Sequence, residues 1–287
     1  MPPPRMFAHQ DLEGDSMSAA PSRTDQSRAD YLVSNPIAVG PPADAGEFRR
    51  EYERFERLLP QRAPLRVLDV GCGTGAWSVH WVARRCLVTG VDFDAEFIAR
   101  ARLRDGLRNG DAFRGIVADA TRLPPDIGPF DVVTLNSLLE HVPDWRAVVV
   151  EAVRVLAPGG VLILHTTNRH HPFQGEVAHF PFYPWLPGPI RDRILAWIMK
   201  YRRDLVNYTE FPAVHWFSFV QLSRVLRDLG LDVYDRLDLM RPEQMTGVRS
   251  LGRWMLGSDG RPARGRFLFY HLTPGVSLYA RRPDRSA

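Results

Sequence analysis

Lysine is almost missing from this chain: Lys200 stands alone among 37 basic residues, and the others are arginine. We interpret this bias as codon usage in a GC-rich genome rather than as a functional signal. Cysteine is scarce too, with only Cys72 and Cys86, which excludes a disulfide scaffold or a cysteine-based zinc cluster and favours a reducing compartment. No apolar run reaches the length of a membrane span, and the first residues lack the apolar region of a secretory signal. We therefore expect a cytoplasmic protein.

The remaining composition is that of a globular protein. The chain has 287 residues, of which 45% are hydrophobic and 24% charged, and it can bury a sizeable core without disulfides. Its length favours one large domain or two small ones. The formal net charge of +4 permits contact with nucleic acid or with an anionic membrane, but so modest a balance argues for neither.

Residues 1–44 differ from the rest of the chain. They hold seven prolines and many serine, aspartate and arginine residues, with little periodic apolar pattern. We predict a disordered or loosely docked tail there.

From residue 45 onward, short apolar runs alternate with helical patterns. We expect strands over 65–70, 87–91, 115–118, 130–135, 161–166, 231–237 and 276–280. We expect helices over 48–59, 76–85, 95–107, 145–156, 190–205 and 219–229. Strands that alternate with helices predict a doubly wound α/β fold, in which a mostly parallel sheet carries helices on both faces.

The strongest local signal is the glycine-rich turn at 71–75, which follows the first predicted strand and opens a helix. Such a turn lets the backbone approach a ligand closely, and the helix N-terminus beside it is electropositive. An acid, Asp92, ends the second predicted strand 21 residues after Gly71, where it can accept hydrogen bonds from both hydroxyls of a ribose. The pattern predicts a nucleotide-containing cofactor.

The spacing of the glycines separates this turn from a dinucleotide site. Dinucleotide folds use G-x-G-x-x-G, whereas this chain has G-x-G-x-G preceded by Asp69, an acid that suits a cationic amino group better than a pyrophosphate. The run DVGCGTG at 69–75 resembles the first motif of class I S-adenosylmethionine-dependent methyltransferases. FDVVTLNSLLEHV at 130–142 and LAPGGVLIL at 156–164 resemble later motifs of that family, in order and at the expected spacing.

The resemblance implies a Rossmann-like sheet of seven strands whose last strand is antiparallel, with S-adenosyl-L-methionine as the cofactor. It also implies a single domain, with a cofactor-binding core over 45–170, an inserted lid over 171–215 and the remainder of the sheet over 216–287. The residues that it places at the cofactor are Asp69, Gly71, Gly73, Gly75, Asp92, Asp119, Ala120 and Asn136. For two of these an alternative stays open: Asp119 as a cap or turn acid, and Asn136 as a partner for buried backbone.

For the acceptor side, the resemblance points to Glu140 and His141 after the fourth predicted strand. A histidine with a pKa near about 6.5 can take the proton of a phenol or hydroxyl as the carbon–oxygen bond forms. The alternative is that His141 only holds its loop against the sheet. The pattern is nearest to that of ubiquinone-biosynthesis O-methyltransferases. The resemblance implies a Glu-x-x-Glu-His motif at this place, whose two carboxylates and one histidine are suited to bind a divalent metal. Ser137 replaces the first glutamate here, so we predict no metal site.

The segment 171–215 combines prolines, aromatic residues and histidines with one basic amphipathic helix. In this fold such a segment lies beyond the carboxyl ends of the strands, near the acceptor. Two interpretations stay open for it. It is a lid whose apolar face closes a hydrophobic acceptor pocket, or its part 181–205 rests on anionic lipid at the inner face of the membrane. His170, His171, His179 and His215 lie in or beside this segment, and two interpretations stay open for them: they are polar loop residues, or one of them lines the acceptor pocket.

We favour transfer of a methyl group to a small, lipophilic or aromatic acceptor through oxygen. Methylation of nucleic acid, suggested by the arginine-rich stretch 241–274, is the second hypothesis. It is disfavoured because position 136 starts Asn-Ser-Leu-Leu rather than a base-methylating Asn/Asp-Pro-Pro-aromatic motif. A non-catalytic protein that binds the cofactor is the third. The sequence predicts no oligomeric state.

Overall fold

The computed structural model describes residues 44–108, 110–173, 176–177, 180–206, 212–239, 270–271 and 273–284. The predicted tail over 1–44 therefore lies outside the described residues, apart from Asp44, and so does most of the arginine-rich stretch 241–274.

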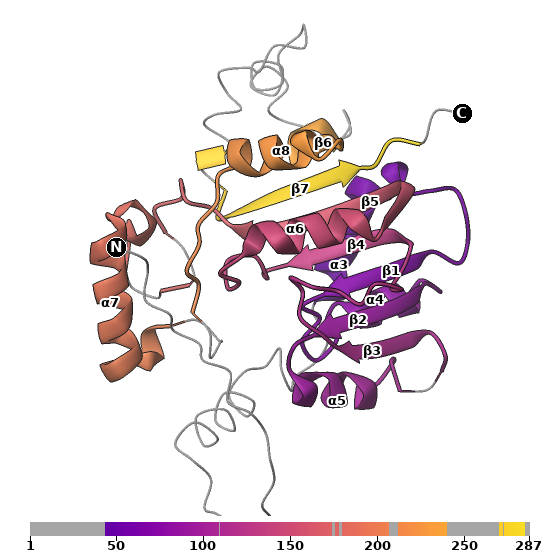
Figure 1. The fold of residues 1–287 in the computed structure, drawn as a ribbon, viewed down its shortest axis with the longest axis horizontal. Helices are drawn as coiled ribbons and strands as arrows, with labels where there is room; N and C mark the ends of the chain where they lie inside the picture. The colour runs from indigo at the N-terminus through magenta and orange to yellow at the C-terminus, as the bar shows by residue number, and fades with distance from the viewer. Residues whose placement is uncertain are drawn as a thin grey trace, which may run out of the picture.

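The described residues form one seven-stranded sheet between two layers of helices (Figure 1). In chain order the strands are β1 (Arg66–Val70), β2 (Leu87–Asp92), β3 (Phe113–Val117), β4 (Phe130–Asn136), β5 (Leu156–Thr167), β6 (Asp232–Asp235) and β7 (Gly275–Arg281). Their order across the sheet is β3-β2-β1-β4-β5-β7-β6. β1 to β5 pair in parallel, and β7 runs antiparallel to both β5 and β6. The predicted mostly parallel sheet with an antiparallel last strand is confirmed.

The described helices cover the two faces of the sheet, except for α7 (Gly188–Tyr201), which lies beside the sheet. They are α3 (Ala45–Phe55), α4 (Ser78–Ala83), α5 (Ala95–Leu103), α6 (Trp145–Arg154), α7, α8 (Phe219–Asp228) and α9 (Arg236–Leu239). Short 3-10 turns occupy Glu56–Leu58, Tyr183–Trp185 and Arg203–Leu205. Phe48 and Phe55 of α3 pack with Trp81 of α4 on one face. The helices α6 and α8 cover the other.

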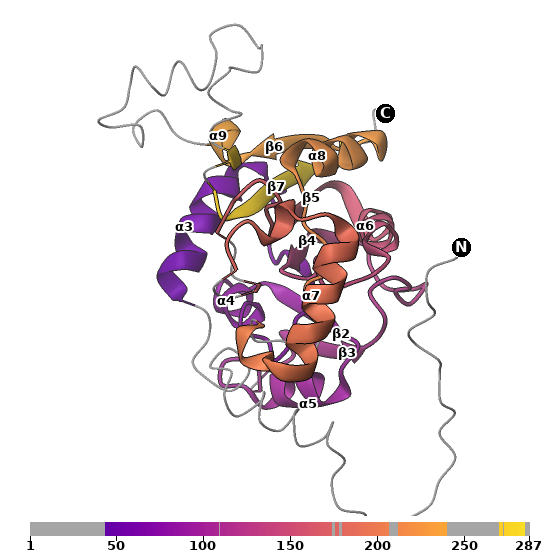
Figure 2. The ribbon, with the colours of Figure 1, turned by 90° about the vertical axis from the view of Figure 1, so that its left-hand side faces the viewer.

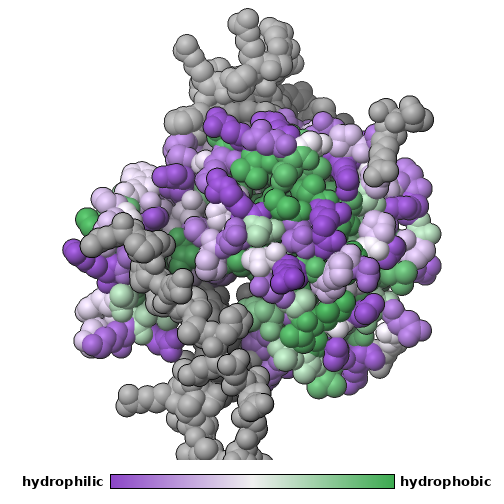
Figure 3. All heavy atoms as spheres, viewed as in Figure 1, coloured by the Kyte–Doolittle hydropathy of each residue, from purple (hydrophilic) through white to green (hydrophobic). Residues whose placement is uncertain are grey.

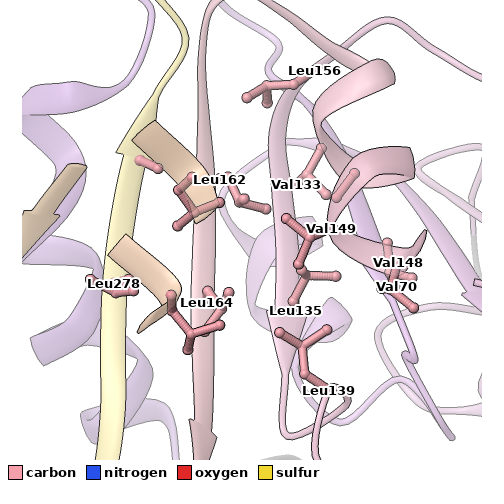
Figure 4. Close-up of a cluster of buried hydrophobic side chains, with 14 of the residues drawn as sticks. Val70, Val133, Leu135, Leu139, Val148, Val149, Leu156, Leu162, Leu164 and Leu278 are labelled. Carbon is pink, nitrogen blue, oxygen red and sulfur yellow. The ribbon is translucent and has the colours of Figure 1, made fainter. Parts of the chain in front are cut away.

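The larger core lies between the central strands and the pair α6 and α8 (Figure 4). Leu135 of β4 and Leu164 of β5 are fully buried in it, and Val149 of α6 projects toward them (Figure 4). Alternate residues on these strands reach the opposite core, where Val132 and Ile163 join α3 and α4. Both faces of the strands are therefore apolar, as expected of a parallel sheet covered on both sides.

Several elements begin or end a few residues away from the sequence-based expectation, and two of these differences have a visible cause. β5 begins at Leu156 rather than 161, because Leu156 already pairs with Phe130 of β4. The register then shifts, so that Val161 pairs with Val132 and the Pro-Gly-Gly turn lies between the two pairs. β6 ends at Asp235 rather than 237, and the short helix α9 follows. The amide of Asp238 donates to a carboxylate oxygen of Asp235 at 2.8 Å, and the amide of Asp235 donates back to Asp238 at 2.9 Å. This reciprocal capping starts a helix where a longer strand was predicted.

The segment between β5 and α8 forms a small body of its own beside the sheet. Its core contains Val177, Tyr183, Ile198, Ala213 and Trp216. In Figure 2, α7 stands in front of the sheet, on the side where β2 and β4 end. We call residues 171–215 the insertion. No helix among the described residues is long and apolar enough to span a bilayer.

Candidate cofactor and acceptor site

The site lies at the carboxyl ends of β1, β2 and β4. The strand order reverses at β1: β2 and β3 lie on one side of it, and β4 and β5 on the other. Val70 at the end of β1 pairs with Val91 on one side and Leu135 on the other, so the loops after all three strands meet there. In open α/β sheets this reversal is the position at which ligands bind.

The glycine turn after β1 is tied to β2. The amides of Gly71 and Cys72 both donate to the carbonyl of Val91, at 2.7 and 3.0 Å. A side chain would be strained at Gly71 and at Gly75, where φ is +71° and +77°: a Cβ at Gly71 would lie 2.8 Å from a methyl group of Leu138, and one at Gly75 would lie 2.5 Å from a methyl group of Leu107.

Gly73 is different, and it shows that the turn fits a cofactor. Its φ is +52°, and a Cβ built there would meet no heavy atom within 4 Å. The middle glycine thus borders open space at the carboxyl edge of the sheet. A ligand can approach the backbone closely at this one point of the turn.

Asp92 lies beside the turn, as its position in the sequence predicted. One carboxylate oxygen accepts from the amide of Gly73 at 2.9 Å, and the other accepts from the amide of Asp94 at 3.0 Å. Burial raises the pKa of Asp92, although these amide hydrogen bonds oppose the shift. Each carboxylate oxygen has a second lone pair, so the side chain can still accept from two ribose hydroxyls. That binding role stays a prediction.

Asp69 occupies a more buried position than its place before the glycines suggests. It is 2% exposed, and its two oxygens accept from the hydroxyl groups of Ser78, at 2.6 Å, and Thr134, at 2.8 Å. Burial raises its pKa. In this structure Asp69 links β1 to β4 and to the helix that follows the turn. Its predicted contact with the amino-acid part of the cofactor stays a prediction.

Arg104, just after α5, is a residue of the site that the sequence reasoning missed. Its guanidinium group donates to the carbonyl of Thr74 at 2.6 Å and to the hydroxyl of Thr74 at 2.8 Å. It therefore holds the glycine turn at Thr74, next to the residue that Asp92 holds. An arginine near the end of a predicted helix is ordinary, so only the folded arrangement identifies it.

The remaining predicted cofactor residues lie at strand ends around the turn. Asp119 and Ala120 follow β3, and Asp119 is exposed while one of its oxygens accepts from both the amide and the hydroxyl of Thr121 at 2.8 Å. Asn136 ends β4, opposite His165 of β5. These positions agree with cofactor contacts but do not test them, and the turn-acid alternative for Asp119 has direct hydrogen-bond support.

Glu140 and His141 lie in the loop after β4, and that loop touches the glycine turn through Leu138. The Glu140 carboxyl is 1% exposed and accepts from the hydroxyl of Thr166 at 2.7 Å. Burial raises its pKa to about 8. His141 is half-buried, and its amide donates to the carbonyl of Leu138 at 3.0 Å. The predicted catalytic role of Glu140 is untested; its burial favours a positioning role instead.

The segment 212–217 closes this side of the site. The amides of Val214 and His215 both donate to the carbonyl of Glu140, at 2.8 and 3.1 Å. The hydroxyl of Thr167 donates to the carbonyl of His215 at 3.0 Å, and the His215 ring lies 3.0 Å from the carbonyl of Pro143. The end of the insertion is therefore fastened to the loop that carries His141.

The other candidate histidines are less central. The rings of His170 and His271 are in tilted contact with centroids 4.5 Å apart, and the ring of His171 contacts the carbonyl of Phe173. His179 lies outside the described residues. Within the described ranges, no group of three or more histidine, cysteine, aspartate or glutamate side chains is arranged to hold a metal ion.

The fold and the glycine turn together define a class I S-adenosylmethionine-dependent methyltransferase. A family model described as a methyltransferase domain matches residues 45–235, and the chain belongs to that family. The cofactor is S-adenosyl-L-methionine.

Curated relatives share part of this sequence. The chain is 41% identical over 108 residues to the ubiquinone biosynthesis O-methyltransferase of Psychrobacter cryohalolentis, a match that covers 37% of this chain and 42% of the relative. It is 42% identical over 119 residues to the enzyme of the same name from Pseudomonas aeruginosa, and this match covers 39% of this chain and 50% of the relative. The chain thus matches half or less of the length of each of these relatives.

Solved structures share the fold over a longer span. A phosphoethanolamine N-methyltransferase of Haemonchus contortus, in complex with S-adenosylhomocysteine, has a TM-score of 0.53 at 15% identity and covers 91% of this chain and 58% of its own. An S-adenosylmethionine-dependent methyltransferase of Mesorhizobium loti has a TM-score of 0.51 at 20% identity, and the match covers 81% of this chain and 97% of that one. At these identities the likeness shows the fold alone.

Proposed function

We propose that this methyltransferase transfers the methyl group to an oxygen atom of a small, lipophilic or aromatic acceptor. The observation that carries the proposal is the placement of His141. It lies in the loop whose Leu138 packs on Gly71, beside the cofactor turn. A hydroxyl acceptor must lose its proton as the new bond forms, and a half-buried imidazole suits that task.

The cofactor, when bound, supplies a methyl group on a sulfonium centre that is open to direct displacement. The chain's part is to hold the acceptor oxygen in line with that methyl and to exclude water. His141 accepts the hydroxyl proton. Glu140, anchored by Thr166, fixes the backbone of the loop so that the His141 ring keeps its position.

The insertion supports the nature of the acceptor. It places a cluster of aromatic and aliphatic side chains beside the carboxyl ends of the strands, around Tyr183, Ile198 and Trp216. The surface is hollowed next to it (Figure 3). These side chains form the core of the insertion, which therefore stands as a packed body at this end of the site, in the position of a lid over a lipophilic ring. The curated relatives, named for O-methylation in ubiquinone biosynthesis, agree with this class of acceptor.

The test is an acceptor panel. The full chain is incubated with methyl-labelled S-adenosylmethionine and alkylated phenols and catechols, alkylated amines, or total RNA. Release of S-adenosylhomocysteine and labelled product are measured. We expect labelled ethers from the phenols or catechols only. Label in the amines or the RNA, with none in the phenols, would overturn the proposal on oxygen and on the acceptor class.

A further inference from the structure

The helix α7 buries only a small part of its apolar surface. Ile198 is 1% exposed and faces the core of the insertion, whereas Ile190, Trp197 and Tyr201 are 46%, 52% and 60% exposed. Residues 190, 197 and 201 are separated by seven and four positions, so they lie along one side of the helix. A single helix therefore has a buried apolar side and a second, exposed apolar side.

The exposed side of α7 also carries positive charge. Arg193 and Lys200 lie four residues before and three residues after Trp197, and both are exposed. The ammonium group of Lys200 lies 5.0 Å from the ring centroid of Tyr201. Between residues 188 and 203 the chain has five basic residues and one acid, Asp192. Basic and aromatic residues are thus interleaved on the same surface.

The residues just before α7 in the chain include further exposed aromatic side chains. Phe182 and Trp185 are 46% and 55% exposed, and their rings lie 5.0 Å apart. Phe173 is 66% exposed, with its ring 6.2 Å from that of Phe182. Figure 3 shows purple, pale and green spheres interspersed over the insertion, and Figure 2 shows α7 as the foremost element of this side. We call the exposed residues Phe173, Phe182, Trp185, Ile190, Arg193, Trp197, Lys200 and Tyr201 the aromatic–basic face.

We propose that the aromatic–basic face binds the surface of an anionic membrane. Tryptophan and tyrosine favour the interfacial region of a bilayer, and lysine and arginine beside them are attracted to acidic headgroups. A helix that lies in the plane of the interface needs this combination of apolar and basic residues on one side. The buried side of α7 meanwhile keeps the helix attached to the insertion.

Charge distinguishes this partner from a second copy of the chain. In a symmetric dimer built on this face, Arg193 and Lys200 of both copies would be brought into one interface, and this concentration of positive charge opposes association. An anionic lipid surface has the opposite charge. The proposal does not depend on which acceptor the enzyme methylates.

The experiment is co-sedimentation of the full chain with phosphatidylcholine vesicles and with vesicles that also contain phosphatidylglycerol. We expect sedimentation only with the anionic vesicles at low salt. We expect it to be lost at about 1 M salt, where electrostatic attraction is screened beyond about 3 Å. Arg193→Glu/Lys200→Glu should lower the partition coefficient by at least about tenfold.

The matched control is Arg224→Glu/Arg227→Glu. It makes the same change of charge at two exposed residues of α8, away from α7 in Figures 1 and 2, and it should bind the anionic vesicles nearly as well as the unaltered chain. Trp197→Ser/Tyr201→Ser tests the apolar part and should also reduce binding. Thermal unfolding of each variant verifies that it is folded, and the charge variants remain informative if the aromatic variant is not.

Three results would overturn the proposal. The first is no sedimentation with anionic vesicles at low salt. The second is an equal loss of vesicle binding in the α7 and α8 charge variants, because binding would then depend on the net charge of the protein and not on this face. The third is a dimer in light scattering that Trp197→Ser/Tyr201→Ser dissociates, which would assign the face to a second copy of the chain.

Discussion

Replacement of Asp92 by alanine tests two tasks of one carboxylate. In the structure its oxygens accept from the amides of Gly73 and Asp94, at 2.9 and 3.0 Å. The same oxygens are proposed to accept from the ribose hydroxyls of the cofactor. Asp92→Ala therefore removes hydrogen bonds from the free protein as well as from the complex, and the two losses are measured separately.

The loss of stability is limited by the cost of burying the carboxylate. Each hydrogen bond to a charged acceptor contributes about 1.5–3 kcal/mol, but the raised pKa of Asp92 shows that burial offsets part of this. We expect a net destabilisation of about 2 kcal/mol, which lowers Tm by roughly 4–8 °C in a domain of this size. For the cofactor, two lost hydrogen bonds should weaken binding at least about tenfold, or about 1.4 kcal/mol.

Isothermal titration calorimetry with S-adenosylmethionine and thermal unfolding measure these quantities. Asp94→Ala is the matched control, because Asp94 is a neighbouring buried carboxylate that caps α5 through the amides of Glu96 and Phe97. It should lower Tm with little change in cofactor affinity. If both variants lose stability and both keep the affinity of the unaltered protein, Asp92 only clamps the turn, and the ribose contact is refuted.

Three further predictions concern residues around the turn. Arg104→Ala should weaken cofactor binding several-fold by calorimetry, and Arg104→Lys should restore little, because one ammonium group cannot reproduce the two-atom contact with Thr74; full affinity in the alanine variant would contradict this. His141→Ala should lower turnover by roughly 10²–10⁴ with cofactor affinity unchanged, and a joint loss of affinity and Tm would make His141 structural. The pKa of Glu140 is raised to about 8, so the folded state keeps a proton that the unfolded state loses above about 4.5. Stability should therefore fall as pH rises from about 5 to 8, by at most about 4 kcal/mol, and Glu140→Gln should flatten that fall in denaturant titrations; parallel curves would refute the shift.

The sheet was predictable because each strand carries its own signal. The run 161–164 is continuously apolar and the run 67–70 is apolar apart from Asp69, since helices cover both faces, and glycine or acid marks where such runs end. The position of Asp92 beside the glycine turn followed from the same pattern, because neighbouring parallel strands end at one edge. The start of α9 also had a signal in the spacing of Asp235 and Asp238, which the strand prediction overlooked.

The contacts that hold the site together had no comparable signal. Arg104 reaches Thr74 across 30 positions, and Thr166 reaches Glu140 across 26. In both cases the two residues belong to different elements, and each residue type is ordinary at its own position. Only the packed fold gives these side chains their partners, so local pattern shows where the site lies but not what holds its loops.

The central position of β7 also has a consequence for synthesis on the ribosome. Before β7 emerges, β5 has an open edge and β6 has no neighbour, because β7 lies between them. The hydroxyl of Tyr279 in β7 also donates to Glu51 in α3 at 2.6 Å, which links one of the earliest described elements to the last. The nascent chain must therefore carry an unprotected strand edge until nearly all described residues have been made. An exposed edge of this kind readily pairs with other chains, so chaperone protection is most valuable during that interval.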